Sequence, residues 1–456
     1  MITLTISDAF VPEKTYIIDV LLSDFLGLDY KLIVNSQAKD YELTTANGGR
    51  LVIRDHFFGK FIGGQNYFQA NEIPSNISFL KNQFVTEGDI PVIFGTDEFV
   101  CRKKEITCGI DIFASSFFML SRWEEYANTK RDAHNRFPSI ESLAYKEGFL
   151  NRAIVNEHVE MLWYMLCYLK CGQPRKGRLF RIFATHDVDA PFLYASKSPA
   201  VAMKQFGGDL VKRGNPVAAF NNLNLWAKTA RSRAKRDPYN TFDSIMDFSE
   251  RAGNHSAFLF IAACARPEYD GNYSISDKLP RGLLAGIHKR GHDIGLHLSY
   301  GSFNSPQQTK KEFGILRKVC SEEGIWQRQW LSRQHFLRWE TPTTFGNLDE
   351  AGIDFDSTLS YADHAGFRCG VCYDFPVFNI LTRKKLGLRE RPLLVMECSV
   401  IDRRYMGLGA GEEAFLYIKS IKDTCRRFRG DFVVLWHNTR FIDLQELRLY
   451  AQILQA

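Results

Sequence analysis

The hydrophobic and polar positions of the first 170 residues predict a mixture of helices and strands. Three segments carry apolar residues at intervals of three and four, which predicts amphipathic helices: 16–26, 117–126 and 151–168. Three shorter segments predict strands by alternation or by β-branched and aromatic content: 30–34, 41–44 and 51–53. A turn containing Asn47-Gly48-Gly49 lies between the last two and favours a hairpin. The first part of the chain is therefore predicted to be mixed α/β.

From Arg178 onward, apolar strands alternate with helical patterns. The first strands are expected at 179–189, 257–263 and 292–297, and the helices at 242–248, 283–290 and 306–320. Later apolar segments at 331–339, 391–397 and 432–438 are interpreted as further strands. Such alternation predicts a parallel sheet or barrel with helices outside it.

A short breaker segment separates these two patterns. Residues 171–177 combine Gly172, Pro174 and a basic run, which is typical of a linker. A chain of 456 residues also exceeds what one core usually organises. We therefore predict a smaller N-terminal domain over 1–175, whose role stays open, and a second domain over 178–456.

The second domain is expected to carry a basic helical insertion near 191–240. Residues 226–238 contain five lysines and arginines and end at Pro238. We interpret this segment as a solvated helix face; a lid or a contact to an anionic glycan is the alternative.

Composition and charge argue against some classes of partner but do not identify one. The net charge is +6, from 58 basic and 52 acidic residues, without the single-sign field that nucleic-acid binding requires. The longest uncharged apolar run, 257–265, is too short to span a bilayer. The N-terminus lacks a basic stretch followed by a long apolar one, so a cytoplasmic protein is expected. The ten cysteines are interpreted as free thiols, including the isolated pair Cys369 and Cys372.

The strongest candidate for chemistry is the segment Thr185-His186-Asp187-Val188-Asp189. Strand side chains alternate between faces, so Asp187 and Asp189 are expected on one side. Two carboxylates in one small volume favour a shared proton or a bound cation, and the pair then divides into a base and a metal ligand. Capping of the next helix is the alternative for an isolated pair of this kind.

Further polar residues follow later apolar strands. The candidates are His297, Arg333 with His335, Glu397 and His437. A single histidine at such a place is more often structural. Three of them, recurring with the acid pair at strand ends, predict a site at one edge of the sheet.

In this order the motifs resemble those of the polysaccharide deacetylase family, the NodB-like carbohydrate esterases. The match rests on Asp187-Val188-Asp189 and on Gly291-His292-Asp293-Ile294-Gly295-Leu296-His297. The segments 121–126 and 136–138 look like an uncharacterised N-terminal region found in a subgroup of these proteins, often among bacterial surface-polysaccharide genes. The resemblance is strongest over 179–300 and 431–438. It implies a distorted (β/α) barrel of NodB type in the C-terminal part.

The resemblance also implies roles for individual residues. Asp187 corresponds to the base that activates water, Asp189 and His297 to metal ligands, and His437 to the acid that protonates the leaving group. Arg333 corresponds to the arginine that orients the base. The implied cofactor is a divalent metal, with zinc preferred, and the implied reaction removes an acetyl group from a sugar, with N-acetyl preferred over O-acetyl.

The chain departs from the family pattern at one metal ligand. The second histidine expected four residues after His297 is replaced by Gly301, which has no side chain to offer. His335 is our candidate for the missing imidazole, with a supporting or substrate-contact role as the alternative. Ser302, Asn304 or water would be weaker substitutes. Glu397 is a further candidate, as the carboxylate that orients His437.

The leading hypothesis is a metal-dependent deacetylase that acts on an acetylated sugar in bacterial surface-polysaccharide metabolism. A NodB-like glycan-binding or assembly protein without full metal affinity is the second hypothesis. A metal-dependent amidase acting on a small cyclic amide is the third. The sequence predicts neither the exact substrate nor the oligomeric state.

Overall fold

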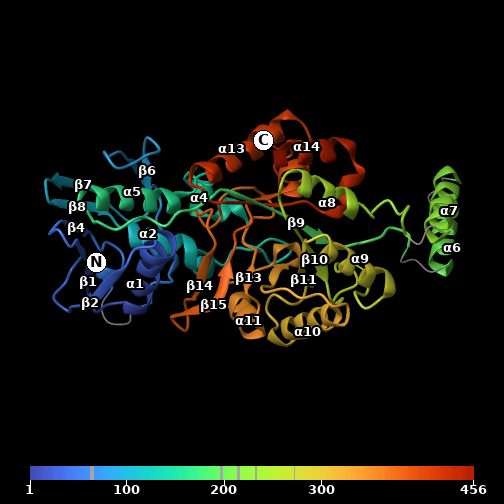
Figure 1. Cartoon of the computed structure of the whole chain (residues 1–456), viewed down its shortest axis with the longest axis horizontal. Coiled ribbons are helices and arrows are strands. Elements are labelled where there is room, and N and C mark those ends of the chain that lie inside the picture. The colour runs from blue at the N-terminus through green and yellow to red at the C-terminus, as the bar shows by residue number, and fades with distance from the viewer. Residues whose placement is uncertain (62–65, 196–198, 213–215, 232–233, 272, 456) are drawn as a thin grey trace.

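The computed structural model describes residues 1–61, 66–195, 199–212, 216–231, 234–271 and 273–455. It is an α/β structure with two large sheets, and Figure 1 shows the N-terminal one beside the C-terminal one. Within the described ranges, no helix combines the length and the hydropathy that crossing a membrane requires.

The N-terminal sheet has six strands in the order β2-β1-β3-β4-β8-β7. They are β1 (Ile2–Ile6), β2 (Tyr30–Val34), β3 (Tyr41–Thr44), β4 (Arg50–Ile53), β7 (Gly95–Arg102) and β8 (Glu105–Ile110). β5 (Ser78–Leu80) and β6 (Ile90–Val92) form a separate pair. The predicted hairpin is confirmed, because β3 pairs antiparallel with β4 and Leu43 faces Leu51.

Five α-helices of the described N-terminal region accompany this sheet. The α-helices are α1 (Val11–Ile18), α2 (Ile112–Ser121), α3 (Trp123–Ala127), α4 (Leu143–Lys146) and α5 (Ile154–Tyr168). Shorter turns are the π-helix η1 (Asp19–Phe25) and the 3₁₀ helices η2 (Phe58–Lys60), η3 (Ala70–Glu72) and η4 (Ser139–Glu141). The helix expected over 117–126 is instead broken, because Arg122 adopts a left-handed backbone with φ of 53°.

The C-terminal sheet has nine strands in the order β14-β15-β13-β12-β11-β10-β9-β17-β16. They are β9 (Arg181–Val188), β10 (Ser256–Ile261), β11 (Asp293–Leu298), β12 (Leu331–Gln334), β13 (Phe355–Asp356), β14 (Phe375–Asn379), β15 (Lys384–Glu390), β16 (Val395–Met396) and β17 (Asp431–Leu435). All neighbours are parallel except β14 with β15. The sheet curls into a half-barrel, with β14 and β16 at its edges.

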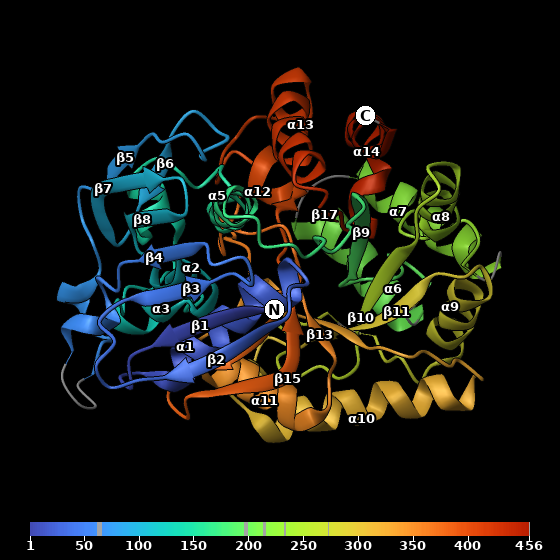
Figure 2. The ribbon, with the colours of Figure 1, turned by 60° about the vertical axis from the view of Figure 1, so that its left-hand side comes forward.

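Helices lie outside the curled sheet, as Figure 2 shows for α8, α9 and α10 beside β9, β10 and β11. The helices of this part of the chain are α8 (Phe242–Arg251), α9 (Lys278–Lys289), α10 (Pro306–Glu322), α11 (Thr343–Ala351), α12 (Glu397–Ile401), α13 (Glu412–Arg427) and α14 (Leu444–Gln455). The 3₁₀ turn η6 (His335–Leu337) follows β12, as α12 follows β16, and the 3₁₀ turn η7 (Asn438–Ile442) comes after β17. The prediction of a strand over 391–397 was wrong. Only Val395 and Met396 pair with a neighbouring strand, and Glu397 already begins α12.

The segment expected as a helical insertion contains α6 (Pro199–Gly207), the π-helix η5 (Gly208–Lys212) and α7 (Pro216–Arg231). Figure 1 shows α6 and α7 standing away from the rest of the chain. Residues 196–198, 213–215 and 232–233 of that expected insertion lie outside the described residues.

A buried ion cluster joins the end of α3 to the C-terminal part of the chain. The Glu125 carboxylate accepts hydrogen bonds from Arg122 Nε at 2.9 Å and from Arg368 Nε and Nη2 at 2.9 and 2.5 Å. All three side chains are at most 3% exposed. Elsewhere the Tyr16 hydroxyl donates to the Pro376 carbonyl at 2.8 Å. The N-terminal helices α1 and α3 therefore make buried polar contacts with the C-terminal part of the chain.

Replacing Glu125 by glutamine should lower the free energy of unfolding by about 3–5 kcal/mol, because two buried guanidinium groups lose their shared counter-charge. Chemical denaturation followed by tryptophan fluorescence measures this change. The matched control is Glu141→Gln, which removes an exposed pair with Lys146 and should change stability by less than about 1 kcal/mol. Equal effects of the two variants would mean that the cluster does not stabilise the fold.

Candidate active site

The carboxyl end of β9 brings the acid pair into the curled sheet. β9 lies between β10 and β17, and its side chains alternate as the sequence predicts. His186 points to the opposite side, where its Nδ1 lies 2.7 Å from the Trp436 carbonyl oxygen. Burial lowers the pKa of His186 to about 4, so this imidazole is neutral and structural. Asp187 and Asp189 are left facing the histidines of neighbouring strands.

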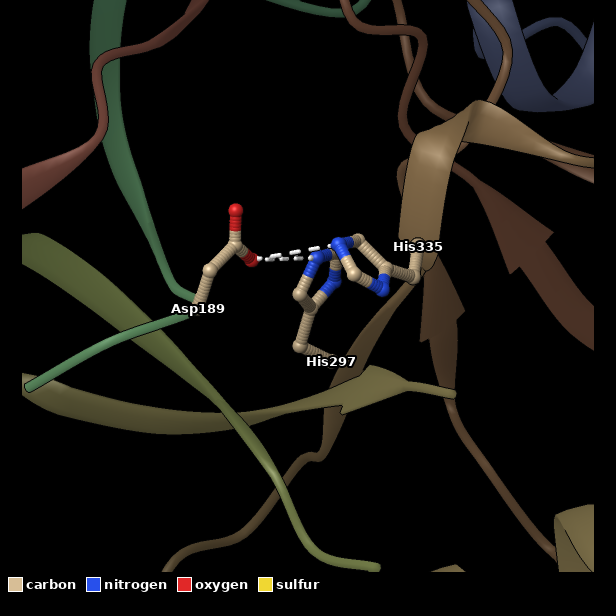
Figure 3. Close-up of side chains that lie close together, drawn as sticks. All are labelled: Asp189, His297 and His335. Carbon is tan, nitrogen blue, oxygen red and sulfur yellow. Dashed lines mark ion pairs between the residues drawn. The ribbon is translucent and has the colours of Figure 1, made fainter. Parts of the chain in front are cut away.

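Asp189, His297 and His335 form the centre of the site. Figure 3 shows both imidazole rings turned toward the Asp189 carboxylate. Asp189 Oδ1 lies 3.3 Å from His297 Nε2 and 3.5 Å from His335 Nε2. One ligand atom from each of the three residues lies within 4.8 Å of the others. The strand ends of β9, β11 and β12 thus supply one carboxylate and two imidazoles to one point.

The donor atoms of this cluster fit a divalent metal. His297 directs Nδ1 at the Arg333 carbonyl oxygen at 3.1 Å, and His335 directs Nδ1 at Asp270 Oδ1 at 3.0 Å. Both rings therefore turn Nε2 inward, as metal-ligating histidines with an oriented second nitrogen do. Within the described chain, Asp189 Oδ1 and His297 Nε2 are buried without a hydrogen-bond partner. Burial lowers the pKa of His335, but Asp189 and Asp270 outweigh it and raise that pKa to about 9, so the carboxylates favour a cation here.

His335 remains the candidate for the imidazole that Gly301 cannot supply. It is the first residue of η6, directly after β12, and its ring lies 4.8 Å from that of His297. Ser302 is buried and its hydroxyl is engaged with the Ser299 carbonyl at 2.7 Å and Gln334 Oε1 at 2.9 Å. His335 offers a ligand atom within 4.8 Å of those of Asp189 and His297.

Asp270 is a site residue that the sequence analysis missed. Its Oδ1 faces His335 and accepts from the Tyr300 amide at 2.6 Å, while Oδ2 accepts from the amides of Ala265 and Arg266 at 3.0 and 2.7 Å. These bonds hold the carboxylate in place against the imidazole. Asp270 follows β10 in a loop without hydrophobic periodicity, so no sequence pattern marked it.

Replacing Asp270 by asparagine should weaken metal binding by roughly 10- to 100-fold, because a neutral amide is a weaker acceptor for His335 Nδ1 than the carboxylate and no longer raises the basicity of the imidazole. Titration of the metal-free full chain with Zn²⁺ in a competing chelator measures the affinity. Asp277→Asn is the control, since Asp277 is exposed at the start of α9. An unchanged affinity in Asp270→Asn would show that the Asp270 carboxylate does not support the metal site through His335.

Asp187 is held by an arginine from β12. Arg333 Nη1 lies 2.8 Å from Asp187 Oδ1, and the guanidinium also donates to the Ser357 carbonyl at 2.8 Å. Arg333 is fully buried, and the Asp187 side chain is 3% exposed. Burial raises the pKa of Asp187, but Arg333 and the nearby histidines outweigh it and hold the pKa below its ordinary value. Asp187 is therefore an ionised carboxylate with Oδ2 3.7 Å from His297 Nε2.

His437 faces the cluster from the other side, at the end of β17. Its Nε2 lies 3.7 Å from Asp189 Oδ2, and its Nδ1 lies 2.5 Å from Glu397 Oε1. Glu397 is completely buried and also accepts from the His437 amide at 3.2 Å. Burial lowers the pKa of His437, but the Glu397 carboxylate outweighs it and holds that pKa well above its usual range. His437 is thus a protonated imidazole.

These groups line a cavity of about 300 Å³. Its floor contains Asp187, Asp189, His297, His335 and His437, and its rim contains Arg404, Tyr405 and Arg440. His134 and Arg136, from the loop after α3, also line it. A segment that lies far away in the sequence therefore forms part of the cavity wall.

The chain was compared with protein families, with curated proteins and with solved structures. A family of unknown function, DUF7033, matches residues 2–170. No curated protein matches the chain. Among solved structures, the chain is similar to a polysaccharide deacetylase from Mycobacterium smegmatis, with 17% identity over 61% of this chain and 83% of that one, and a TM-score of 0.37.

Two other solved structures are similarly distant. A polysaccharide deacetylase from Pseudomonas aeruginosa has 12% identity over 61% of this chain and 83% of that one, with a TM-score of 0.36. An allantoinase has 12% identity over 60% of this chain and 82% of that one, with a TM-score of 0.35. Similarity this low does not fix a family, so the function has to be inferred from the geometry of the site.

Proposed function

We propose that the chain is a metal-dependent hydrolase that removes an acetyl group from a sugar, with an N-acetyl amide as the preferred bond. One observation carries this proposal: an arginine-held carboxylate, Asp187, and a carboxylate-held imidazole, His437, both lie within 4 Å of a carboxylate-imidazole cluster. The site thus places a base and an acid beside one metal position. Metabolism of bacterial surface polysaccharides is the setting that the sequence resemblance suggests.

Asp189, His297 and His335 would hold the metal. When bound, a divalent ion such as Zn²⁺ supplies a Lewis acid that lowers the pKa of water and polarises an acyl carbonyl. Asp187 accepts the proton of the attacking water, and Arg333 keeps its carboxylate ionised and oriented. His437 donates its proton to the leaving nitrogen, since Glu397 keeps the imidazole protonated.

The second and third hypotheses differ in what the site would do. A binding protein without metal affinity has no use for the oriented imidazoles of His297 and His335, whose Nε2 atoms converge on Asp189. A cyclic-amide hydrolase would use the same acid and base, so the substrate decides between them.

The test is acetate release by the metal-free full chain before and after addition of Zn²⁺. The panel holds N-acetylglucosamine oligomers, O-acetylated xylan oligomers and, for the third hypothesis, allantoin. Metal-dependent acetate release that a chelator abolishes supports the proposal. Ring opening of allantoin alone would favour an amidase. No stoichiometric metal after addition of Zn²⁺, together with no turnover of any substrate, would favour a binding protein.

A further inference from the structure

The loop 132–136 of the N-terminal region, which forms part of the cavity wall, is held in place by hydrogen bonds. Asp132 Oδ1 accepts from the amides of His134 and Arg136 at 2.8 and 2.9 Å, and its Oδ2 accepts from Arg136 Nε at 2.7 Å. These bonds fix the loop 132–136 as one compact turn. Because His134 and Arg136 both line the cavity, the turn presents an imidazole and a guanidinium to whatever occupies it.

This loop is also fixed to the C-terminal part of the chain beside the metal-binding candidates. Arg136 Nη1 donates to the Phe336 carbonyl at 3.1 Å, directly after His335. Arg338 Nε donates to the His134 carbonyl at 2.8 Å, and His134 Nδ1 lies 3.2 Å from the Tyr300 hydroxyl. The ring of His134 packs against Phe336 with 4.8 Å between centroids. The N-terminal region therefore completes the cavity and is more than a cover for the sheet.

The residues at the rim of the cavity carry more positive than negative charge, because the carboxylates inside the cavity already have partners. Asp187 pairs with Arg333, and Asp189 faces the histidines. Among the lining residues, Asp402 is the carboxylate that remains, and Arg440 Nη2 already binds it at 2.8 Å.

Among the arginines that line the cavity, Arg404 has the most distant carboxylate partner. Its Nη2 lies 3.6 Å from Asp402, beyond hydrogen-bond distance, and no closer carboxylate is found in the described parts of the chain. Its side chain is 68% exposed while lining the cavity. Burial and the guanidinium groups of Arg136, Arg338 and Arg404 lower the pKa of His134 and outweigh the opposing Asp132 carboxylate, which agrees with several guanidinium groups lying near this wall. Such a guanidinium is suited to a carboxylate or phosphate oxygen.

We propose that the loop 132–136, with Arg404, forms an anion-binding wall that selects acetylated sugars carrying a carboxylate or phosphate near the acetyl group. This inference rests on the proposed deacetylase function and adds the substrate class. It also assigns a role to the region that matches the family of unknown function: it supplies part of the substrate pocket.

The kinetic test compares charged and neutral acetylated sugars on the Zn²⁺-loaded full chain. The carboxylate arm is a tetrasaccharide of alternating glucuronate and N-acetylglucosamine against the neutral N-acetylglucosamine tetramer. The phosphate arm is N-acetylglucosamine 6-phosphate against N-acetylglucosamine. We expect kcat/KM to favour one charged sugar by roughly tenfold or more, chiefly through KM. The arm that shows the preference identifies the anion.

Arg404→Gln should reduce this preference by roughly tenfold, and 0.5 M salt should reduce it in the parent protein. Arg403→Gln is the matched control, because Arg403 is the exposed neighbour and does not line the cavity. For the loop, His134→Ala should raise KM severalfold at unchanged metal content, whereas the exposed His56→Ala should not. A preference that is absent, or equally reduced in Arg403→Gln, would overturn the anion-binding wall.

Equilibrium binding separates the two proposals. Calorimetry with the glucuronate tetrasaccharide should show binding that Arg404→Gln weakens and Arg403→Gln keeps. Acetate release from neutral sugars alone, without this binding difference, would overturn the inference and leave the deacetylase standing. Binding of the charged tetrasaccharide that depends on Arg404, without acetate release from any sugar, would overturn the proposed function and keep the anion-binding wall.

Discussion

Replacing Asp187 by asparagine is expected to lower kcat for acetyl release by about 10⁴-fold, the upper end of what a general base contributes. The amide has the shape of the carboxylate and still offers Oδ1 to Arg333, which lies 2.8 Å away. It cannot accept the proton of the attacking water. Metal content should stay near that of the parent protein, because the ligand candidates are Asp189, His297 and His335.

The measurement combines single-substrate kinetics with elemental analysis of the same preparations. Asp293→Asn is the control, since Asp293 begins β11 at the opposite end of that strand from His297. Loss of metal in Asp187→Asn would make Asp187 a ligand. Full activity with metal retained would place the base elsewhere.

The C-terminal sheet was predictable wherever apolar strands and amphipathic helices alternate. β9, β10, β11 and β17 occur where that pattern predicts them. The β14–β15 hairpin was not predicted. Pro376 interrupts the pattern of the first strand, and Lys384 and Lys385 remove the apolar pattern at the start of the second. The apolar residues at 392–396 are all buried, but only Val395 and Met396 pair as a strand, so burial alone does not predict strand pairing.

The central part of the site was also visible in the sequence. Alternation along β9 correctly places Asp187 and Asp189 on one face, and the i, i+2 relation brings Arg333 and His335 to the same acid pair. Asp270, His134 and Arg136 were not visible as site residues. They reach the cavity from loops whose path depends on tertiary hydrogen bonds rather than on local periodicity.

Replacing His437 by alanine should lower kcat for N-acetyl sugars by roughly 10² to 10⁴-fold, as expected when a general acid is removed. The physical reason is the poor leaving group of an amide, which departs only when its nitrogen receives a proton. An activated ester such as 4-nitrophenyl acetate has a phenolate that leaves without one. The loss for that ester should therefore be much smaller, within about tenfold.

The ratio of the two losses distinguishes acid catalysis from a structural role. His364→Ala is the control, because His364 contacts the Ala365 carbonyl and does not line the cavity. Equal losses for the sugar and the activated ester would mean that His437 positions Asp189 or the metal instead of donating a proton. A loss confined to the sugar, together with unchanged metal content, would assign the donated proton to the imidazole that Glu397 holds.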